Sequence, residues 1–196
     1  MTRKEFLNNF WEYYCILENE FIDLRRYVEL SQENFSTYSQ EINKQLLSIG
    51  VEFENVCRHL SGKFDKKYNV CDFTTWASEI DGGIAHVEIK LKSCKELIIL
   101  KPFGSWIDGK YANSSWWKAY NLLKHNKIKN YKEGNLKNLT DALAALYFAE
   151  MYYVKKIDAE YGVPNDCSKV FKMDKWDSQC RVFAYDSYIS NREKTT

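Results

Sequence analysis

The sequence predicts a mainly α fold, an antiparallel helical bundle with an inserted β-hairpin, on three observations. Only two prolines and eight glycines interrupt 196 residues, which permits long helices. Three long segments repeat apolar residues at alternating spacings of three and four, the pattern of amphipathic helices. One segment in the middle alternates with a period of two, which is typical of a strand. The length suits a single domain over residues 1–196.

The first sixty residues are predicted to form a helical hairpin. Apolar side chains recur at helical spacing over Leu7–Val28 and again over Phe35–Leu60. Asn34 or Ser36 is the candidate N-cap of the second helix. Because the link "SQENFS" is short, we expect the two helices to lie antiparallel.

The middle of the chain is predicted to change from helix to strand. A brief helix capped by Asp72 is expected to end at Ile80, where "DGG" breaks it. The stretch "IAHVEIKLKS" alternates apolar and polar residues, and "KELIILKPF" contains an apolar run. Residues 84–103 should therefore form an inserted β-hairpin. A lone hairpin is only marginally stable, so this one must pack on the helices or on a partner.

Polar and apolar side chains are separated on the helix within "SSWWKAYNLLKHNK", which Asn113 or Ser114 is expected to cap. Residues three and four apart share a face of a helix, so a polar stripe runs beside an apolar one. The polar stripe contains Ser114, Lys118, Asn121 and His125, and the apolar stripe contains Trp116, Ala119, Tyr120 and Leu123.

The last long helix is expected to begin around Asn135 and to continue through Ile157. Its apolar seam is interrupted by Glu150, which is either at the rim of the core or paired. We expect the rim, because buried carboxylates are rare. Residues 165–196 lack a clear period and are predicted to be irregular, with one candidate strand at Cys180–Tyr185.

The polar stripe carries the groups needed for acid–base chemistry on a phosphodiester. A histidine such as His125 exchanges protons readily near neutral pH, the amide of Asn121 can orient a group, and Lys118 can neutralise a phosphate. No HxxxH, HExxH or carboxylate pair at ligand spacing lies nearby, so we expect neither a metal nor another cofactor. The alternative is a solvent-exposed histidine without a catalytic role.

Charge is segregated along the chain although the formal net charge is only +1. Between Lys118 and Lys137 there are six lysines and one acid, whereas Glu12 to Glu33 holds six acids and two arginines. Such segregation suits the binding of an anion, or the matching of one chain to another. A solvated lysine-rich loop is the alternative.

The cysteines and the N-terminal segment favour a cytoplasmic protein. None of the six cysteines forms a CxxC pair, and Cys15 and Cys57 fall within predicted helices. They are typical of small buried hydrophobic residues in a reduced compartment rather than of disulfides or a zinc site. The opening "MTRKEFLNNFWEYY" lacks an apolar signal core, and no apolar run approaches the length of a membrane span.

The stretch "WWKAYNLLKHNK" followed by "NLKNLTDALAALYFAEMYY" resembles the C-terminal half of a HEPN-type domain, a helical bundle of prokaryotic toxin–antitoxin and abortive-infection systems. The family signature is an arginine, a polar residue that is often asparagine, three further residues and a histidine. Asn121 and His125 match it, and Tyr120 stands in the place of the arginine. The resemblance covers roughly Trp116–Tyr153 by motif and the leading helical hairpin by architecture only.

In active members of this family, the arginine and histidine of two subunits meet at a dimer interface and cut RNA without a metal. The resemblance therefore implies an RNA-cleaving or RNA-binding component of a prokaryotic defence or stress system. Its partners would be a second copy through the helix bearing His125, RNA, and an antitoxin or other protein. The implied roles are acid–base catalysis for His125, orientation for Asn121, phosphate neutralisation for Lys118 and Lys124, and substrate binding for Lys124, Lys127, Trp117 and Tyr120.

Two alternatives stay open. Because Tyr120 replaces the family arginine, the chain is alternatively a non-catalytic dimeric helical interaction or regulatory module. The resemblance also allows a substrate or partner of a nucleotide-modifying enzyme, with Tyr120 as the modified residue. The two tryptophans have alternatives as well, since Trp116 and Trp117 either stack a base or pack in a core or interface.

Overall fold

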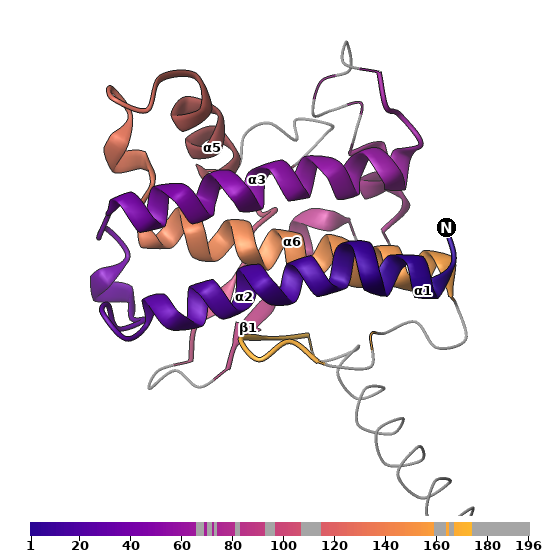
Figure 1. Cartoon of the computed structure of the whole chain (residues 1–196), viewed down its shortest axis with the longest axis horizontal. Coiled ribbons are helices and arrows are strands. Elements are labelled where there is room, and N and C mark those ends of the chain that lie inside the picture. The colour runs from indigo at the N-terminus through magenta and orange to yellow at the C-terminus, as the bar shows by residue number, and fades with distance from the viewer. Residues whose placement is uncertain are drawn as a thin grey trace, which may run out of the picture.

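The computed structural model describes residues 1–65, 69, 72, 74–80, 83–92, 97–106, 115–158, 164 and 167–173. The protein is mainly α-helical with a small three-stranded antiparallel sheet, which confirms the predicted fold class (Figure 1). The α-helices are α1 (Arg3–Phe6), α2 (Glu12–Leu24), α3 (Gln40–Ser61), α5 (Ser115–Asn126) and α6 (Leu136–Ile157). The strands are β1 (Ile89–Leu91), β2 (Ile99–Leu100) and β3 (Phe171–Lys172).

The first predicted helix is formed by α1, a π-helical turn at Leu7–Trp11 and α2, which follow one another directly. Thr2 caps it, since its side chain accepts a hydrogen bond from the Glu5 N–H at 3.2 Å and its own N–H donates to the Glu5 carboxylate at 2.7 Å. The π-turn adds a residue to the local repeat, and both Phe10 and Trp11 within it are buried.

α3 begins later than the sequence predicted. We expected a start at Phe35 with Asn34 or Ser36 as the cap, whereas Ser39 is the N-cap and accepts a hydrogen bond from the first turn. The backbone carbonyls of Phe35 and Thr37 accept hydrogen bonds from the first two residues of α6, at 3.0 and 2.8 Å. This pairing with a distant segment holds residues 35–38 out of the helix, although their apolar spacing fits one.

α2 and α3 are antiparallel, which confirms the predicted helical hairpin (Figure 1). Lys44 near the start of α3 lies 3.6 Å from the carboxylate of Glu20 near the end of α2. His59 near the end of α3 contacts Phe10 edge-on, with ring centroids 5.0 Å apart. α6 is covered by the other elements and is buried around nearly its whole circumference. It is therefore the central helix of the bundle.

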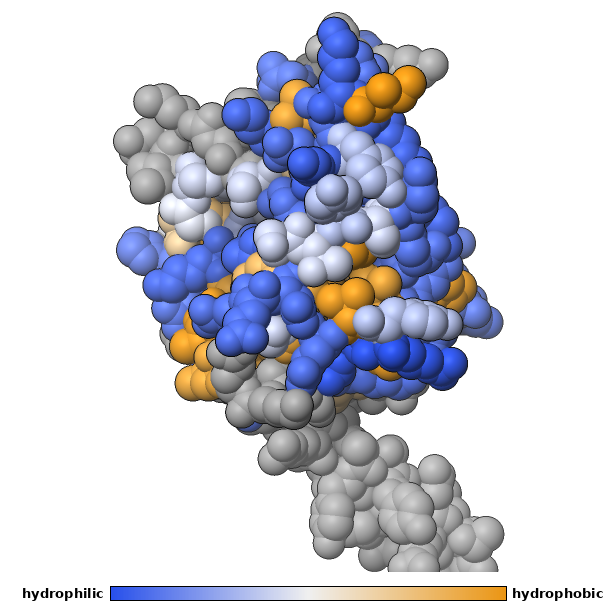
Figure 2. All heavy atoms as spheres, turned by 90° about the vertical axis from the view of Figure 1, so that its left-hand side faces the viewer, coloured by the Kyte–Doolittle hydropathy of each residue, from blue (hydrophilic) through white to orange (hydrophobic). Residues whose placement is uncertain are grey.

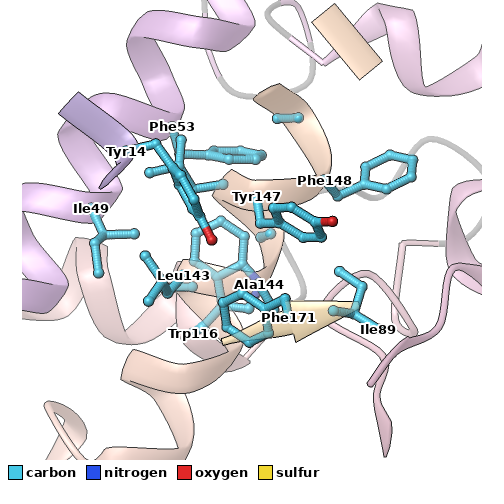
Figure 3. Packing of buried hydrophobic residues seen from close by; sticks show 14 of the residues in the cluster. Tyr14, Ile49, Phe53, Ile89, Trp116, Leu143, Ala144, Tyr147, Phe148 and Phe171 are labelled. Atoms are coloured by element: carbon cyan, nitrogen blue, oxygen red, sulfur yellow. The ribbon is translucent and has the colours of Figure 1, made fainter. Parts of the chain in front are cut away.

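The core is rich in aromatic side chains that come from every layer of the fold. Figure 3 shows Tyr14 of α2, Phe53 of α3, Trp116 of α5, Tyr147 of α6 and Phe171 of β3 in one cluster. The rings of Phe53 and Trp116 meet edge-on at 5.0 Å, and those of Tyr147 and Phe171 stack at 5.7 Å. The helices and the sheet therefore share one core.

The inserted hairpin is present but shorter than predicted. Ile89 of β1 lies opposite Leu100 of β2, and both are buried against the helices. Residues Ile84–His86, expected to belong to the first strand, form a 3-10 turn. Within the described residues, the brief helix expected to end at Ile80 is a 3-10 helix over Thr75–Glu79.

A third strand, β3, pairs with the other edge of β1 and lies in the segment 165–196 that we predicted to be irregular. Two residues show no period, so the sequence pattern misses such a strand. The buried carboxylate of Glu18 in α2 holds the segment in place. It accepts hydrogen bonds from Tyr14 Oη, Ser168 Oγ and the backbone N–H groups of Lys169 and Val170. The candidate strand at Cys180–Tyr185 lies outside the described residues.

The described cysteines are free thiols that differ in their burial. Cys57 is a buried free thiol in α3 and Cys15 is half-buried in α2, in accord with their predicted packing role, whereas Cys167 is exposed. None of the helices in this part of the chain combines the length and the apolar character that crossing a bilayer requires.

Candidate functional site

α5 separates its polar and apolar side chains as the sequence predicted. Lys118 and His125 are exposed on its outer face, and Asn121 is half-buried beside them. The caps expected at Asn113 or Ser114 lie outside the described residues. The buried face consists of Trp116, Trp117, Ala119, Tyr120 and Leu123.

Tyr120, which stands in the place of the family arginine, is fully buried against α3. Its ring lies directly over Gly50, because a Cβ atom built there would be 2.2 Å from Tyr120 Cδ2. Its hydroxyl donates to Glu54 Oε1 at 3.2 Å and accepts from Lys124 Nζ at 3.1 Å. Burial raises the pKa of Tyr120, which keeps this hydroxyl protonated. The residue therefore ties α5 to α3.

Lys124, predicted to neutralise a phosphate, is engaged within the chain. Its Nζ lies 3.1 Å from Glu54 Oε1 and 5.0 Å from the centroid of the Tyr120 ring. Burial opposes the charge of Lys124, but its hydrogen bonds to Tyr120 and Glu54 outweigh this effect and hold its pKa above the ordinary value. A phosphate at Lys124 would have to compete with Glu54.

Asn121 and Trp117 are also involved in contacts within the chain. The side-chain amide of Asn121 donates to the backbone carbonyl of Trp117, one turn earlier, at 2.9 Å. Trp117 is only 5 % exposed, and its ring contacts Phe53 at 5.8 Å and Tyr120 at 5.2 Å. The indole has no open face for a base here, so its position agrees with the packing alternative.

Several lysines on the outer face of α5 and in the loop that follows it form no ion pair with a described residue. They are Lys118, Lys127, Lys129 and Lys132, all exposed. Some lysines elsewhere are paired, for example Lys44 with Glu41 at 2.9 Å and Lys101 with Glu88 at 2.8 Å. Unpaired ammonium groups can neutralise an added anion without first breaking an ion pair.

The loop that carries these lysines is fixed to α5 by two asparagines. Asn126 Oδ1 accepts a hydrogen bond from the Lys129 N–H at 3.2 Å. Asn130 Nδ2 donates to the carbonyls of Leu122 and Asn126, at 3.1 and 2.9 Å. Ile128, at the tip, is 93 % exposed. The lysine-rich segment is thus held against the last turns of α5 in one arrangement.

A second group of titratable side chains lies inside the bundle. Glu150 of α6 is fully buried, and neither of its carboxylate oxygens has a hydrogen-bond partner among the described residues. The expectation that it lies at the rim is wrong, because the side chain of Glu150 is completely buried. Burial, reinforced by the charge of Glu52 on α3, raises the pKa of Glu150 well above its ordinary value. Burial also raises the pKa of Glu52.

Among the residues that the structure describes, no group of three or more His, Cys, Asp or Glu side chains is placed to hold a metal ion. No family model matches the chain, and neither the curated proteins nor the solved structures include a match. The HEPN-like assignment therefore stays a prediction from the motif around Asn121 and His125.

Proposed function

We propose that this chain is a HEPN-like RNA-binding protein of a prokaryotic defence or stress system that cleaves RNA when two copies meet through α5. The observation that carries the proposal is the row of unpaired lysines beside the exposed His125. RNA presents closely spaced phosphates, and ammonium groups that neutralise them release bound counterions, which drives binding. The match of Asn121 and His125 to the family signature supports cleavage in addition to binding.

Cleavage without a metal needs only proton transfer and charge stabilisation. The 2′-oxygen of a ribose forms a bond to the adjacent phosphorus, the bond from phosphorus to the 5′-oxygen breaks, and a cyclic phosphate remains. One group removes the proton of the 2′-hydroxyl, and another donates a proton to the departing 5′-oxygen. His125 from each of two copies would fill these two roles, with Lys118 neutralising the phosphate and Asn121 orienting it.

The burial of Tyr120 favours a second candidate, a non-catalytic dimeric interaction module with a protein partner such as an antitoxin. In the family, the arginine at this position contributes to the site that cuts RNA. Tyr120 instead points into the chain and donates to Glu54. A protein that has lost this cation could keep the bundle and its dimer surface without the chemistry.

We expect the purified protein to cleave a mixed pool of cellular RNA in excess EDTA and to leave cyclic-phosphate ends. Removal of an acid–base group typically lowers such rates by about 10²–10⁴-fold, so the His125→Ala variant should show no cleavage above background. Gel analysis of the RNA and analysis of its ends measure both effects. His86→Ala is the matched control, because His86 is an exposed histidine outside α5. Intact RNA with the wild-type protein would favour the interaction module.

We also expect the Lys127→Ala, Lys129→Ala double variant to bind RNA more weakly and with a shallower salt dependence. Each phosphate contact contributes about 0.7 to the slope of log affinity against log salt for single strands, so the slope should fall by about 1.4. Fluorescence anisotropy at several salt concentrations measures it. Lys4→Ala, at an exposed lysine in α1, is the control and should leave the slope unchanged. An equal loss of RNA affinity and salt dependence in the double variant and in Lys4→Ala would contradict a binding site localised to this loop.

A further inference from the structure

Two tyrosines and a lysine lie together at the end of the bundle where the α2–α3 connection meets the α5–α6 connection. The ring of Tyr38 contacts that of Tyr131 edge-on, with centroids 5.6 Å apart, and Lys132 Nζ lies 5.8 Å from the Tyr38 centroid. We call these three residues the Tyr38 platform. Figure 2 views the molecule from this end, where residues of intermediate and high hydropathy lie among hydrophilic ones.

The backbone beneath the platform is held by contacts between the two connections. Tyr38 forms an isolated β-bridge with Asn135. The side-chain amide of Asn43 donates to the carbonyls of Ser39 and Tyr131, at 2.8 and 3.1 Å. Gly134 packs so closely that a Cβ atom there would lie 2.5 Å from Asn43 Oδ1. The rings are therefore placed before any ligand arrives, which lowers the entropic cost of binding.

The platform leaves its main groups accessible. Tyr38 is 42 % exposed, so its ring is not fully used in packing the core. Lys132 is exposed and forms no ion pair with a described residue, whereas the neighbouring Lys137 is paired with Asp141. Glu133 is an exposed acid in the same 3-10 turn as Tyr131 and Lys132, and it opposes an anion there. An aromatic face beside a cation is the arrangement that binds a base and its phosphate in single-stranded nucleic acids.

We propose that the Tyr38 platform is a stacking site for a base of single-stranded RNA. The proposal rests on the proposed function, because it takes as its ligand the RNA bound along α5. The loop after α5 leads directly to Tyr131, so a strand that follows the unpaired lysines from His125 arrives at the platform. A base has to be unpaired and splayed out to stack on a protein ring, so the platform selects single strands over duplexes.

The test is the affinity of the full chain for a labelled single-stranded RNA of about 12 nucleotides, within the range of known single-strand sites, and for a duplex of the same length. Stacking on one aromatic ring corresponds to about 5- to 150-fold in affinity, so Tyr38→Leu should weaken single-strand binding by that factor. Tyr38→Phe keeps the ring and should bind like the wild type. Tyr13→Leu is the matched control, because Tyr13 lies on α2 and is similarly exposed at 38 %.

The outcomes separate this proposal from the proposed function. RNA binding by the wild type that Tyr38→Leu leaves unchanged overturns the platform alone. Absence of RNA binding by the wild type overturns the proposed function and the platform with it. A loss confined to single strands establishes the platform, whether or not the protein cleaves RNA. If Tyr38→Leu fails to fold, Lys132→Ala should weaken and Glu133→Gln should strengthen single-strand binding, and unchanged affinity in both overturns the platform.

Discussion

Replacing Glu150 by glutamine should make the protein more stable at neutral pH, by on the order of 2 kcal/mol. The carboxyl group is fully buried, and its oxygens have no hydrogen-bond partner in the described part of the chain. The folded protein therefore keeps Glu150 protonated, whereas the unfolded chain releases this proton in neutral solution. Holding the proton costs about 1.4 kcal/mol for each pH unit above the ordinary pKa of a glutamate, until the folded pKa is reached. Glutamine has a similar shape and needs no such proton.

The stability of the protein should depend on pH through Glu150. Burial, and next the charge of Glu52, raises the pKa of Glu150 in the folded state, so the folded protein binds more protons than the unfolded chain. Stability then falls as the pH rises from the ordinary glutamate value toward the folded one. The stabilisation by Glu150→Gln should therefore grow with pH across that window. Urea denaturation of both proteins at a series of pH values measures it.

Glu12→Gln is the control for this series, because Glu12 is an exposed glutamate at the start of α2. Its profile should run parallel to that of the wild type. Glu52→Gln should show a smaller effect of the same sign, since it removes the neighbouring charge as well as a partly desolvated acid. A Glu150→Gln variant that is less stable than the wild type at neutral pH would contradict a protonated, unpartnered carboxyl group.

Gly50→Ala should destabilise the protein by about 2 kcal/mol, although alanine favours a helix by about 1 kcal/mol over glycine. The added Cβ would be 2.2 Å from Tyr120 Cδ2, far inside contact distance. The ring is fully buried, and its hydroxyl is held by Glu54 and Lys124, so it cannot move aside without displacing α5. Thermal and urea unfolding measure the loss.

A double-mutant cycle tests the cause of this effect. Tyr120→Leu alone should be destabilising because it leaves a cavity, but in the Gly50→Ala protein the smaller side chain makes room for the new methyl group. The double variant should therefore lose less stability than the sum of the single variants. Ser48→Ala in the same helix is the control and should change stability by no more than about 0.5 kcal/mol. Additive losses would show that the methyl group clashes elsewhere.

The helices and the two faces of α5 could be predicted because local spacing determines them. The apolar stripe through Trp116 and Tyr120 is buried as its spacing indicated, and the hairpin of α2 and α3 follows from a short link. The late start of α3 at Ser39 could not be predicted in this way. It depends on backbone pairing with the start of α6, almost 100 residues away.

The burial of individual side chains and their interaction partners could not be predicted from local sequence patterns either. The seam of α6 placed Glu150 on the core side, but only the assembled bundle shows that this helix is central. The lysine-rich stretch was visible in the sequence, yet the pairing of Lys124 with Glu54 across two helices was not. The Tyr38 platform was missed as well, because its parts come from connections far apart in the chain.

The hydrogen bonds between the Glu18 carboxylate and the segment that precedes β3 also affect when folding can be completed. Apart from Tyr14 Oη, the groups that donate hydrogen bonds to this buried carboxylate belong to Ser168, Lys169 and Val170, about 150 residues later in the chain. At about 5–20 residues per second, a ribosome needs roughly 8–30 s to make that stretch. During this time the nascent α2 can pair with α3, but Glu18 has to remain hydrated. Closure of the bundle around it therefore awaits the synthesis of the third strand.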